Sequence, residues 1–361
     1  MQEPIIIILE ISNMHYPRES IIVSTIRSFF RSFAVFIGFF TAFMLLLFGL
    51  ISLSSPYMQP EKSTLLLSPD AKGQRQLLGP TSAVILKLDI SGIIGVKNLT
   101  TEKITSLLLD AQEGILQNDR VKAILLYIDT PGGAVTDSDG IYHAIMAFKT
   151  KHKLPVYAYV DGLCASGGMY IACAADKVFA SSTSVIGSVG VRFGPAFNFS
   201  TLMQRYGVEA LTITQGKDKD ALNPFRPWKA DEDLSYRNLT SAIYKKFVDL
   251  VTSARPALNK QKLISDYGAH VFISEEALEY GYIDAANSNY NEALEALASQ
   301  ANLETYQVMT IQIAHNFLSE LSQARYSFIE KMGNVFSPRT HSLYPELEGK
   351  FLYLYQPGQL L

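Results

Sequence analysis

Cysteine is nearly absent from this chain of 361 residues, which contains only Cys164 and Cys173. Both lie in a segment rich in glycine and alanine, a setting typical of small buried side chains and unlike a framework of disulfides. The sequence has no CxxC pair and no cluster of histidines either. The scarcity of these ligand types argues against a metal centre.

The chain also has no marked excess of acidic or basic side chains. The 31 basic and 34 acidic side chains nearly balance, the formal net charge is -3, and no run of five like charges occurs. A protein that binds nucleic acid usually carries a marked basic excess, so we expect no nucleic-acid partner. The apolar fraction of 48% predicts a sizeable core.

One long stretch has no charge at all. Phe33–Leu53 is an apolar run of about twenty residues, long enough to cross a bilayer as a helix. A cleaved signal peptide is the alternative, but its apolar core is usually about 7–15 residues long. Three arginines lie in residues 1–32, which predicts a cytoplasmic N-terminus. Everything after residue 54 is then outside the cytoplasm, as in a single-pass protein of the inner (plasma) membrane.

The rest of the chain divides by pattern into three parts. Residues 54–82 mix proline, glycine and charge without periodicity, which predicts a linker. In residues 83–285 apolar strands alternate with helices, which predicts an α/β body with a mainly parallel sheet. Residues 286–361 are expected to form a helical and aromatic extension, and its tail from Phe351 to Pro357 is expected to pack against a neighbouring subunit.

The patterns also predict individual elements of the body and the extension. The expected strands are Val84–Ile90, Lys122–Ile128, Pro155–Val160, Lys177–Ala180, Leu211–Thr214 and Gln307–Ile313. The expected helices are Glu102–Gln117, Asp137–Lys149, a segment that opens at Gly167, Asn291–Ser299 and Phe317–Met332.

The most informative stretch runs from Asp161 to Ala172. It places Ser166 between an apolar strand and a segment of small residues that can open a helix. A serine at such a turn has an exposed hydroxyl and neighbouring backbone N–H groups that are free to bind negative charge, which is how a nucleophile is presented. A helix N-cap is the common role of a serine in this position, and this stretch alone leaves both readings open.

Two other stretches bear on whether Ser166 is a nucleophile or a helix N-cap. Asp129–Val135 leaves the carboxyl end of a buried strand, where ligands bind in open α/β sheets, and its paired glycines let backbone N–H groups approach a ligand closely. A simple Pro-Gly turn is the alternative, and no phosphate-loop pattern follows. Gln215–Arg226 has alternating charges and is by default a solvated loop. If one of its lysines were buried near Ser166, the lysine pKa could fall by up to about 3–5 units, enough to make a base.

Jointly these stretches resemble the signal peptide peptidase A (SppA/SohB-type) family of membrane-anchored Ser-Lys serine proteases. The resemblance runs from about residue 83 to 285. It is carried by Asp129-Thr-Pro-Gly-Gly-x-Val, Asp161-Gly-x-x-Ala-Ser-Gly-Gly-x-Tyr-Ile-Ala, Gly187-Ser-Val-Gly-Val, Gly216-Lys-x-Lys-Asp and Ile273-Ser-Glu-Glu-Ala-Leu-Glu-Tyr-Gly-Tyr-Ile-Asp284. Two positions depart from the family pattern: Asp129-Thr130 replaces the usual Asn-Ser, and Cys164 replaces a common alanine.

The resemblance implies a ClpP/crotonase-like fold and acyl transfer without a cofactor. It assigns Ser166 as the nucleophile, Lys219 as the general base, and the N–H groups of Gly133 and Gly167 as oxyanion donors. It also implies apolar peptide substrates such as spent signal peptides, and a homo-oligomer, typically an octamer, with its active sites facing an inner cavity.

Three alternatives are weighed against this reading. A Ser-His-Asp protease of the ClpP kind is disfavoured because none of the six histidines lies in the hundred residues after Ser166. A crotonase-type acyl-CoA enzyme would leave residues 216–220 unexplained and would need no anchor. A catalytically inactive membrane scaffold with the same fold remains open.

Overall fold

The computed structural model describes residues 20–53, 63–313, 347 and 350–355. The chain separates into two compact units, residues 1–61 and 62–361. The helix expected at residues 317–332 lies outside the described residues.

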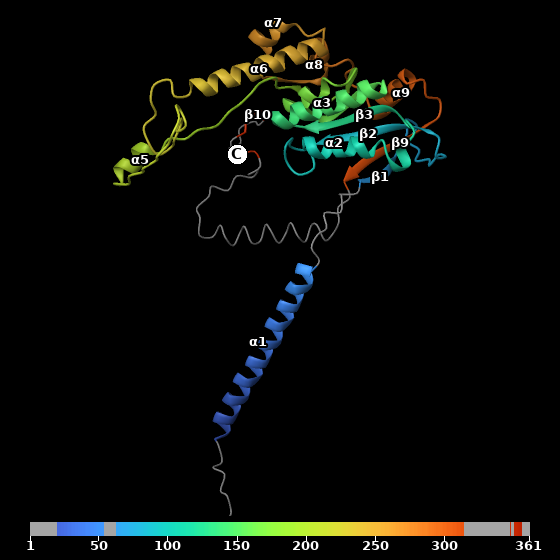
Figure 1. Cartoon of the computed structure of the whole chain (residues 1–361). Coiled ribbons are helices and arrows are strands. Elements are labelled where there is room, and N and C mark those ends of the chain that lie inside the picture. Colours follow the sequence, from blue (N-terminus) through green and yellow to red (C-terminus); the bar gives the residue numbers. More distant parts are fainter. Residues whose placement is uncertain (1–19, 54–62, 314–346, 348–349, 356–361) are drawn as a thin grey trace, which may run out of the picture. The chain divides into compact units, whose positions relative to one another are not determined.

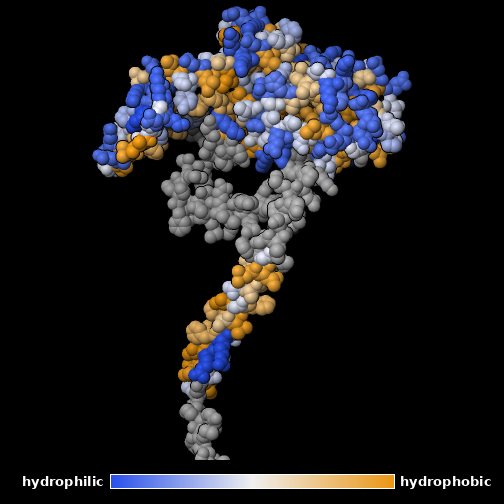
Figure 2. All heavy atoms as spheres, in the orientation of Figure 1, coloured by the Kyte–Doolittle hydropathy of each residue, from blue (hydrophilic) through white to orange (hydrophobic). Residues whose placement is uncertain are grey.

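The first unit contains one long helix, α1 (Ile21–Leu53). Its segment Ile21–Leu47 has a mean hydropathy of 2.0 and no buried residue, so by length and composition it can cross a membrane. Figure 2 shows this apolar surface along the helix. The helix begins upstream of Phe33, and Arg27 therefore lies within it, because no glycine or proline interrupts residues 21–37.

The second unit is built on one mixed sheet in the order β1-β9-β2-β3-β5-β7-β8, with β6 also paired to β5 (Figure 1). Its strands are β1 (Ser63–Ser68), β2 (Ala83–Ser91), β3 (Val121–Thr130), β5 (Val156–Ala165), β6 (Lys177–Ala180), β7 (Val185–Gly187), β8 (Val271–Ile273) and β9 (Tyr306–Ile313). The central strands β2, β3 and β5 are parallel, as the continuous apolar runs predicted. This architecture confirms the α/β fold class.

Helices cover both faces of the sheet. The elements are α2 (Thr101–Asp110), α3 (Val135–His152), α4 (Gly167–Ala172), α5 (Ser200–Arg205), α6 (Leu234–Ala254), α7 (Lys260–Lys262), α8 (Ser274–Glu279) and α9 (Tyr290–Gln300), together with the short helical segments Gly114–Leu116 and Leu263–Tyr267. On β2, Leu86 and Leu88 point into the larger core with α3, α4 and α6, whereas Ile85 packs toward α9 on the opposite face. Each such fully buried side chain stabilises the fold by roughly 1.5–3 kcal/mol.

Several segments differ from their expected structure. Part of the expected linker forms the edge strand β1, which pairs with β9, and β9 itself lies inside the sheet beside β2. Residues 211–214 form no strand and are exposed. The aromatic tail forms β10 (Leu352–Leu354), which pairs with β4 (Gly132–Ala134) of the same chain and so does not require a neighbouring subunit. Whether each of these segments forms a strand depends on a partner that is distant in the sequence, and local periodicity does not encode that partner.

A buried arginine fixes the carboxyl end of α4. Arg255 is 4% exposed, and its guanidinium donates to the carbonyl oxygens of Ala172 (2.8 Å) and Ala175 (2.9 Å). It also pairs with Asp284 at 3.0 Å, and Asp284 accepts from the Val178 amide. The expected motif that ends at Asp284 therefore has a structural role, since it holds in place the helix that begins after Ser166.

We predict that Arg255→Ala lowers the free energy of unfolding by about 3 kcal/mol, because it removes a buried donor shared by the Ala172 and Ala175 carbonyl groups and the Asp284 carboxylate. Chemical denaturation of the purified chain measures this loss. The control is Arg237→Ala, which removes an exposed pair with Asp233 and should cost about 0.5 kcal/mol or less. Equal losses in the two variants would contradict the role of Arg255.

Candidate active site

Ser166 lies between β5 and α4, as the sequence predicted. Its backbone has φ 55° and ψ -110°, a conformation that side-chain-bearing residues rarely adopt, at a cost on the order of 1–3 kcal/mol. The prediction of an exposed hydroxyl is wrong: the residue is 1% exposed, because β10 lies against the adjoining glycine loops. Its N–H donates to the Gly187 carbonyl oxygen at 2.8 Å. The Gly187-Ser-Val-Gly motif, whose role the sequence did not indicate, thus holds the serine backbone in place.

The paired glycines of β4 allow three backbones to meet beside Ser166. Gly132 has φ +95°, and a β-carbon there would lie 2.7 Å from the Gly167 nitrogen. A β-carbon on Gly133 would lie 1.9 Å from the Ile94 carbonyl oxygen, and Ile94 bonds to both neighbours of Gly133. Only glycine fits at these two positions. The structure therefore brings the loop of Gly133 against that of Gly167, the two residues expected to donate to an oxyanion.

The two departures from the family pattern are accommodated locally. The Asp129 carboxylate accepts from the Leu163 amide at 3.0 Å, and the Thr130 hydroxyl donates to Gly92 and accepts from the Gly132 amide at 3.1 Å. Asp129 therefore supports the turn after β5. Cys164 is fully buried, and burial raises the pKa of its thiol to about 12. A protonated, buried thiol offers no competing nucleophile.

Lys219 lies apart from Ser166 within one chain. It belongs to residues 191–233, here called the arm, which connects β7 to α6 and carries α5 away from the sheet (Figure 1). Lys219 is exposed to solvent, whereas Ser166 is buried. The arm also exposes large apolar side chains, among them Leu211 (88%) and Ile213 (87%).

Ion pairs and hydrogen bonds fix the rest of the Gln215–Arg226 stretch in a turn. Arg226 bonds to Asp220 and to Glu232, which also accepts from the amides of Leu222 and Lys229. Hydrogen bonds from Arg226 hold the pKa of Glu232 down to about 2, so this carboxylate remains ionised and the network intact at neutral pH. Asp220 and Arg226 therefore shape the turn that presents Lys219.

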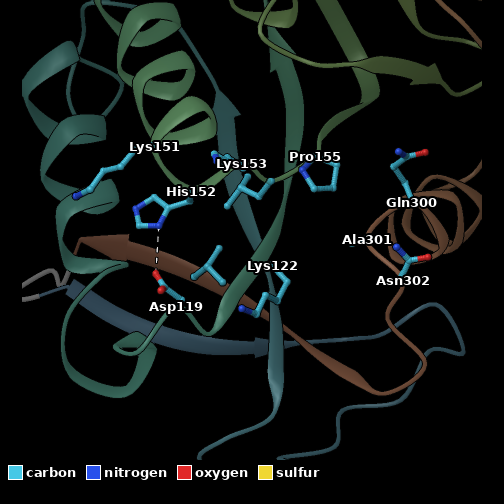
Figure 3. Close-up of a pocket in the computed structure, with 11 residues that line it drawn as sticks. Asp119, Lys122, Lys151, His152, Lys153, Pro155, Gln300, Ala301 and Asn302 are labelled. Atoms are coloured by element: carbon cyan, nitrogen blue, oxygen red, sulfur yellow. Dashed lines mark ion pairs between the residues drawn. The ribbon is translucent and has the colours of Figure 1, made fainter.

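A separate hollow lies at the amino-terminal ends of the central strands. It has a volume of about 480 Å³ and lies between the amino ends of β3 and β5 and the end of α9. Figure 3 shows Lys122, Lys151 and Lys153 around it, with His152 paired to Asp119 at 3.3 Å. Ser166 follows the carboxyl end of β5, so this basic hollow is distinct from the candidate active site.

The described part of the chain holds no group of three or more histidine, cysteine or acidic side chains that could bind a metal ion. The structure brings together a serine in a strained turn and two glycine loops. A serine in such a turn beside backbone N–H groups is typical of serine hydrolases.

Comparison with known proteins identifies the family within this class. The profile of Clp protease matches residues 81–186, and that of peptidase family S49 matches residues 147–304. A candidate protease SohB of Buchnera aphidicola is 30% identical over 221 residues, which cover 59% of this chain and 67% of that protein. The chain therefore belongs to peptidase family S49, and the resemblance to SppA/SohB-type proteases is confirmed.

Other relatives agree with this placement. A candidate protease of Methanocaldococcus jannaschii is 31% identical over 55% of this chain and 63% of its own length. A candidate signal peptide peptidase SppA of Enterococcus faecium is 29% identical over 62% of this chain and 66% of its own length. The chain thus spans less than two thirds of these two curated relatives.

The strain at Ser166 has a measurable consequence. Ser166→Ala and Ser166→Gly both remove the hydroxyl, but glycine tolerates the positive φ, so the glycine variant should be the more stable by about 1 kcal/mol. Denaturation midpoints test this order. The control is the same pair of substitutions at Ser241 in α6. There the alanine variant should be the more stable, because glycine destabilises a helix. A glycine variant at 166 that is no more stable than the alanine variant would contradict the strain.

Proposed function

We propose that this chain is a membrane-anchored serine endopeptidase that cleaves apolar peptides with a Ser166–Lys219 dyad. The observation that carries the proposal is the backbone of Ser166, held in a strained turn against the glycine loop of β4. Such strain persists only where the surrounding structure fixes it, and it is concentrated at functional sites. Membership of family S49 supports the same chemistry.

The reaction is acyl transfer. Neutral Lys219 takes the hydroxyl proton, and the Ser166 oxygen attacks the peptide carbonyl carbon. The N–H groups of Gly133 and Gly167 stabilise the resulting oxyanion. The C–N bond then breaks, the leaving amine takes the proton from the Lys219 ammonium, and an acyl ester remains on Ser166. A water oxygen then attacks the ester carbon while Lys219 takes one of the water protons. The ester C–O bond breaks, the carboxylic acid leaves, and Lys219 returns the proton to the Ser166 oxygen, which restores both groups without a cofactor.

Lys219 reaches Ser166 from a neighbouring copy of the chain in this proposal. A lysine free in water has a pKa near 10.4, so a lysine base must be desolvated. Lys219 is exposed in a single chain, on an arm whose apolar side chains at Leu211 and Ile213 are also exposed. Docking of the arm onto the next subunit would bury Lys219 together with these apolar side chains. A closed ring of identical subunits, eight by family resemblance, satisfies this head-to-tail contact.

Two inactive variants should complement each other. Ser166→Ala and Lys219→Ala are each expected to lower kcat by roughly 10³-fold or more. Co-expression of both in one cell should restore about a quarter of the parent activity, because that fraction of adjacent pairs in a mixed ring supplies both groups. Hydrolysis of a fluorogenic apolar peptide by the detergent-solubilised chain measures this.

Lys217→Ala is the matched control for the dyad, since Lys217 is an exposed lysine on the same turn. It should retain activity alone. No recovery in the mixture would place both groups in one chain. A parent that neither hydrolyses peptides nor reacts at Ser166 with a fluorophosphonate would instead favour the scaffold.

The proposed orientation places the active site outside the cytoplasm, where cleaved signal peptides remain in the membrane. Alkaline phosphatase is active only outside the cytoplasm, so we expect activity when it is fused after residue 60. The same fusion site should leave a cytoplasmic reporter inactive. The reverse pattern would place residues 62–361 in the cytoplasm and remove spent signal peptides of the outer leaflet from the candidate substrates.

A further inference from the structure

The basic hollow at the amino ends of β3 and β5 has the size and charge of a ligand site. Its volume of about 480 Å³ lies in the range of sites that bind small molecules, roughly 300–1,000 Å³. The ammonium groups of Lys122, Lys151 and Lys153 line it together with one carboxylate, that of Asp119 (Figure 3). With His152 neutral, three positive charges and one negative charge leave an excess of two positive charges, in a chain whose formal net charge is -3.

Lys122 reaches the hollow from an irregular strand. The register of β3 against β2 shifts between Val84 and Ile85, which makes Lys122 an extra residue in β3. Bulges of this kind are rare between parallel strands, and they often redirect a side chain at a functional site. Here the bulge leaves the side chain of Lys122 exposed at the hollow.

Lys153 also has an irregular backbone. It follows α3 in the left-handed conformation, with φ 51° and ψ 45°, where glycine or asparagine is usual. The helix dipole accounts for basic side chains in the last turn of α3, which already holds Lys149 and Lys151. It accounts neither for a lysine in the usual place of a glycine nor for Lys122 on a strand.

Neighbouring side chains hold two of the other basic groups in place. The Lys151 ammonium donates to the Gln112 side-chain oxygen at 2.6 Å. The His152 ring lies 4.5 Å from the ring of Phe148, and its Nδ1 lies 3.3 Å from the Asp119 carboxylate. Side chains that are already ordered lose less conformational entropy when a ligand binds.

Lys122 and Lys153 are available to a ligand. Both are exposed, and no ion pair between described residues involves either of them. The exposed carboxamides of Gln300 and Asn302 line the hollow at the end of α9 (Figure 3). Ammonium groups bind phosphate as point charges, whereas carboxamides both donate to and accept from hydroxyl groups. The lining therefore fits an anion on one side and a hydroxylated group on the other.

We propose that the basic hollow binds a phosphate monoester with a hydroxylated remainder, either free in solution or as the headgroup of a lipid. The three lysines bind the phosphate oxygens, and Gln300 and Asn302 bind the hydroxyl groups. A phosphate monoester carries about 1.5 to 2 negative charges at neutral pH, which matches the excess positive charge of the lining. The site is separate from Ser166, so Ser166→Ala should bind the ligand as the parent does.

Equilibrium dialysis of radiolabelled glycerol 3-phosphate against the full chain, in a non-ionic detergent at fixed ionic strength, measures this binding. Lys122→Ala should raise the Kd at least about tenfold, the effect of losing one charge-assisted hydrogen bond. The matched control is Lys246→Ala, since Lys246 is an exposed lysine of α6 that does not line the hollow. Its Kd should equal that of the parent. Equal losses in the two variants, or no binding to the parent, would overturn the inference.

Lys153→Gly separates binding from a structural role. Glycine tolerates the positive φ, so this variant should lose no stability against chemical denaturation. It should nevertheless raise the Kd for glycerol 3-phosphate at least about tenfold. A variant that is less stable than the parent but binds equally well would show that Lys153 serves only the end of the helix, which would contradict the site.

Competition identifies the source of the phosphate group. Unlabelled glycerol 3-phosphate and dioctanoyl phosphatidic acid, the latter carried in the detergent micelles, are compared as competitors of the label. Displacement by the lipid at the lower total concentration would support the site and identify a lipid headgroup as its ligand. Displacement by glycerol 3-phosphate at the lower concentration would support the site and identify a soluble ester. Bound label that neither compound displaces would overturn the inference.

Discussion

Close approach of backbones at Gly132 and Gly133 is the constraint on which the rest of the site depends. The Ile94 segment lies against one edge of β4 and β10 against the other, and no side chain could stand between them. This contact fixes the position of the Gly167 loop and with it the turn of Ser166. The strained turn is then held from its other side by the Gly187 carbonyl oxygen. A substitution at either glycine would therefore separate the proposed oxyanion donors from Ser166.

The central fold could be read from the sequence because its signals are local. The apolar runs of β3 and β5 and the Gly-rich turn after Ala165 each stand in one short stretch. The structure has these elements within a few residues of their predicted bounds. β1 and β9 could not be placed in the same way, because each gains its partner from a segment more than 200 residues away in the chain. The place of such a strand in a sheet follows tertiary context more than propensity.

The same contrast between local signals and long-range contacts applies to the residues of the candidate site. Ser166, Gly133 and Gly167 come from turns whose chemistry is visible in sequence, and the structure brings their loops together. The position of Lys219 depends on how the arm folds, and the arm has few buried residues to fix it by pattern. Arg255 gave no signal in the sequence, and Tyr353 was indicated only as part of an aromatic tail expected to pack. Their roles arise from carbonyl groups and aromatic rings contributed by distant elements.

The burial of both cysteines bears on where this chain can fold. Cys164 and Cys173 are inaccessible, and burial raises the pKa of each thiol to about 12. At neutral pH both thiols then remain protonated, and disulfide exchange requires the thiolate. Once the core has closed, an oxidising compartment has no sulfur to attack. The folded body therefore keeps both cysteines out of disulfide exchange, whichever compartment surrounds it.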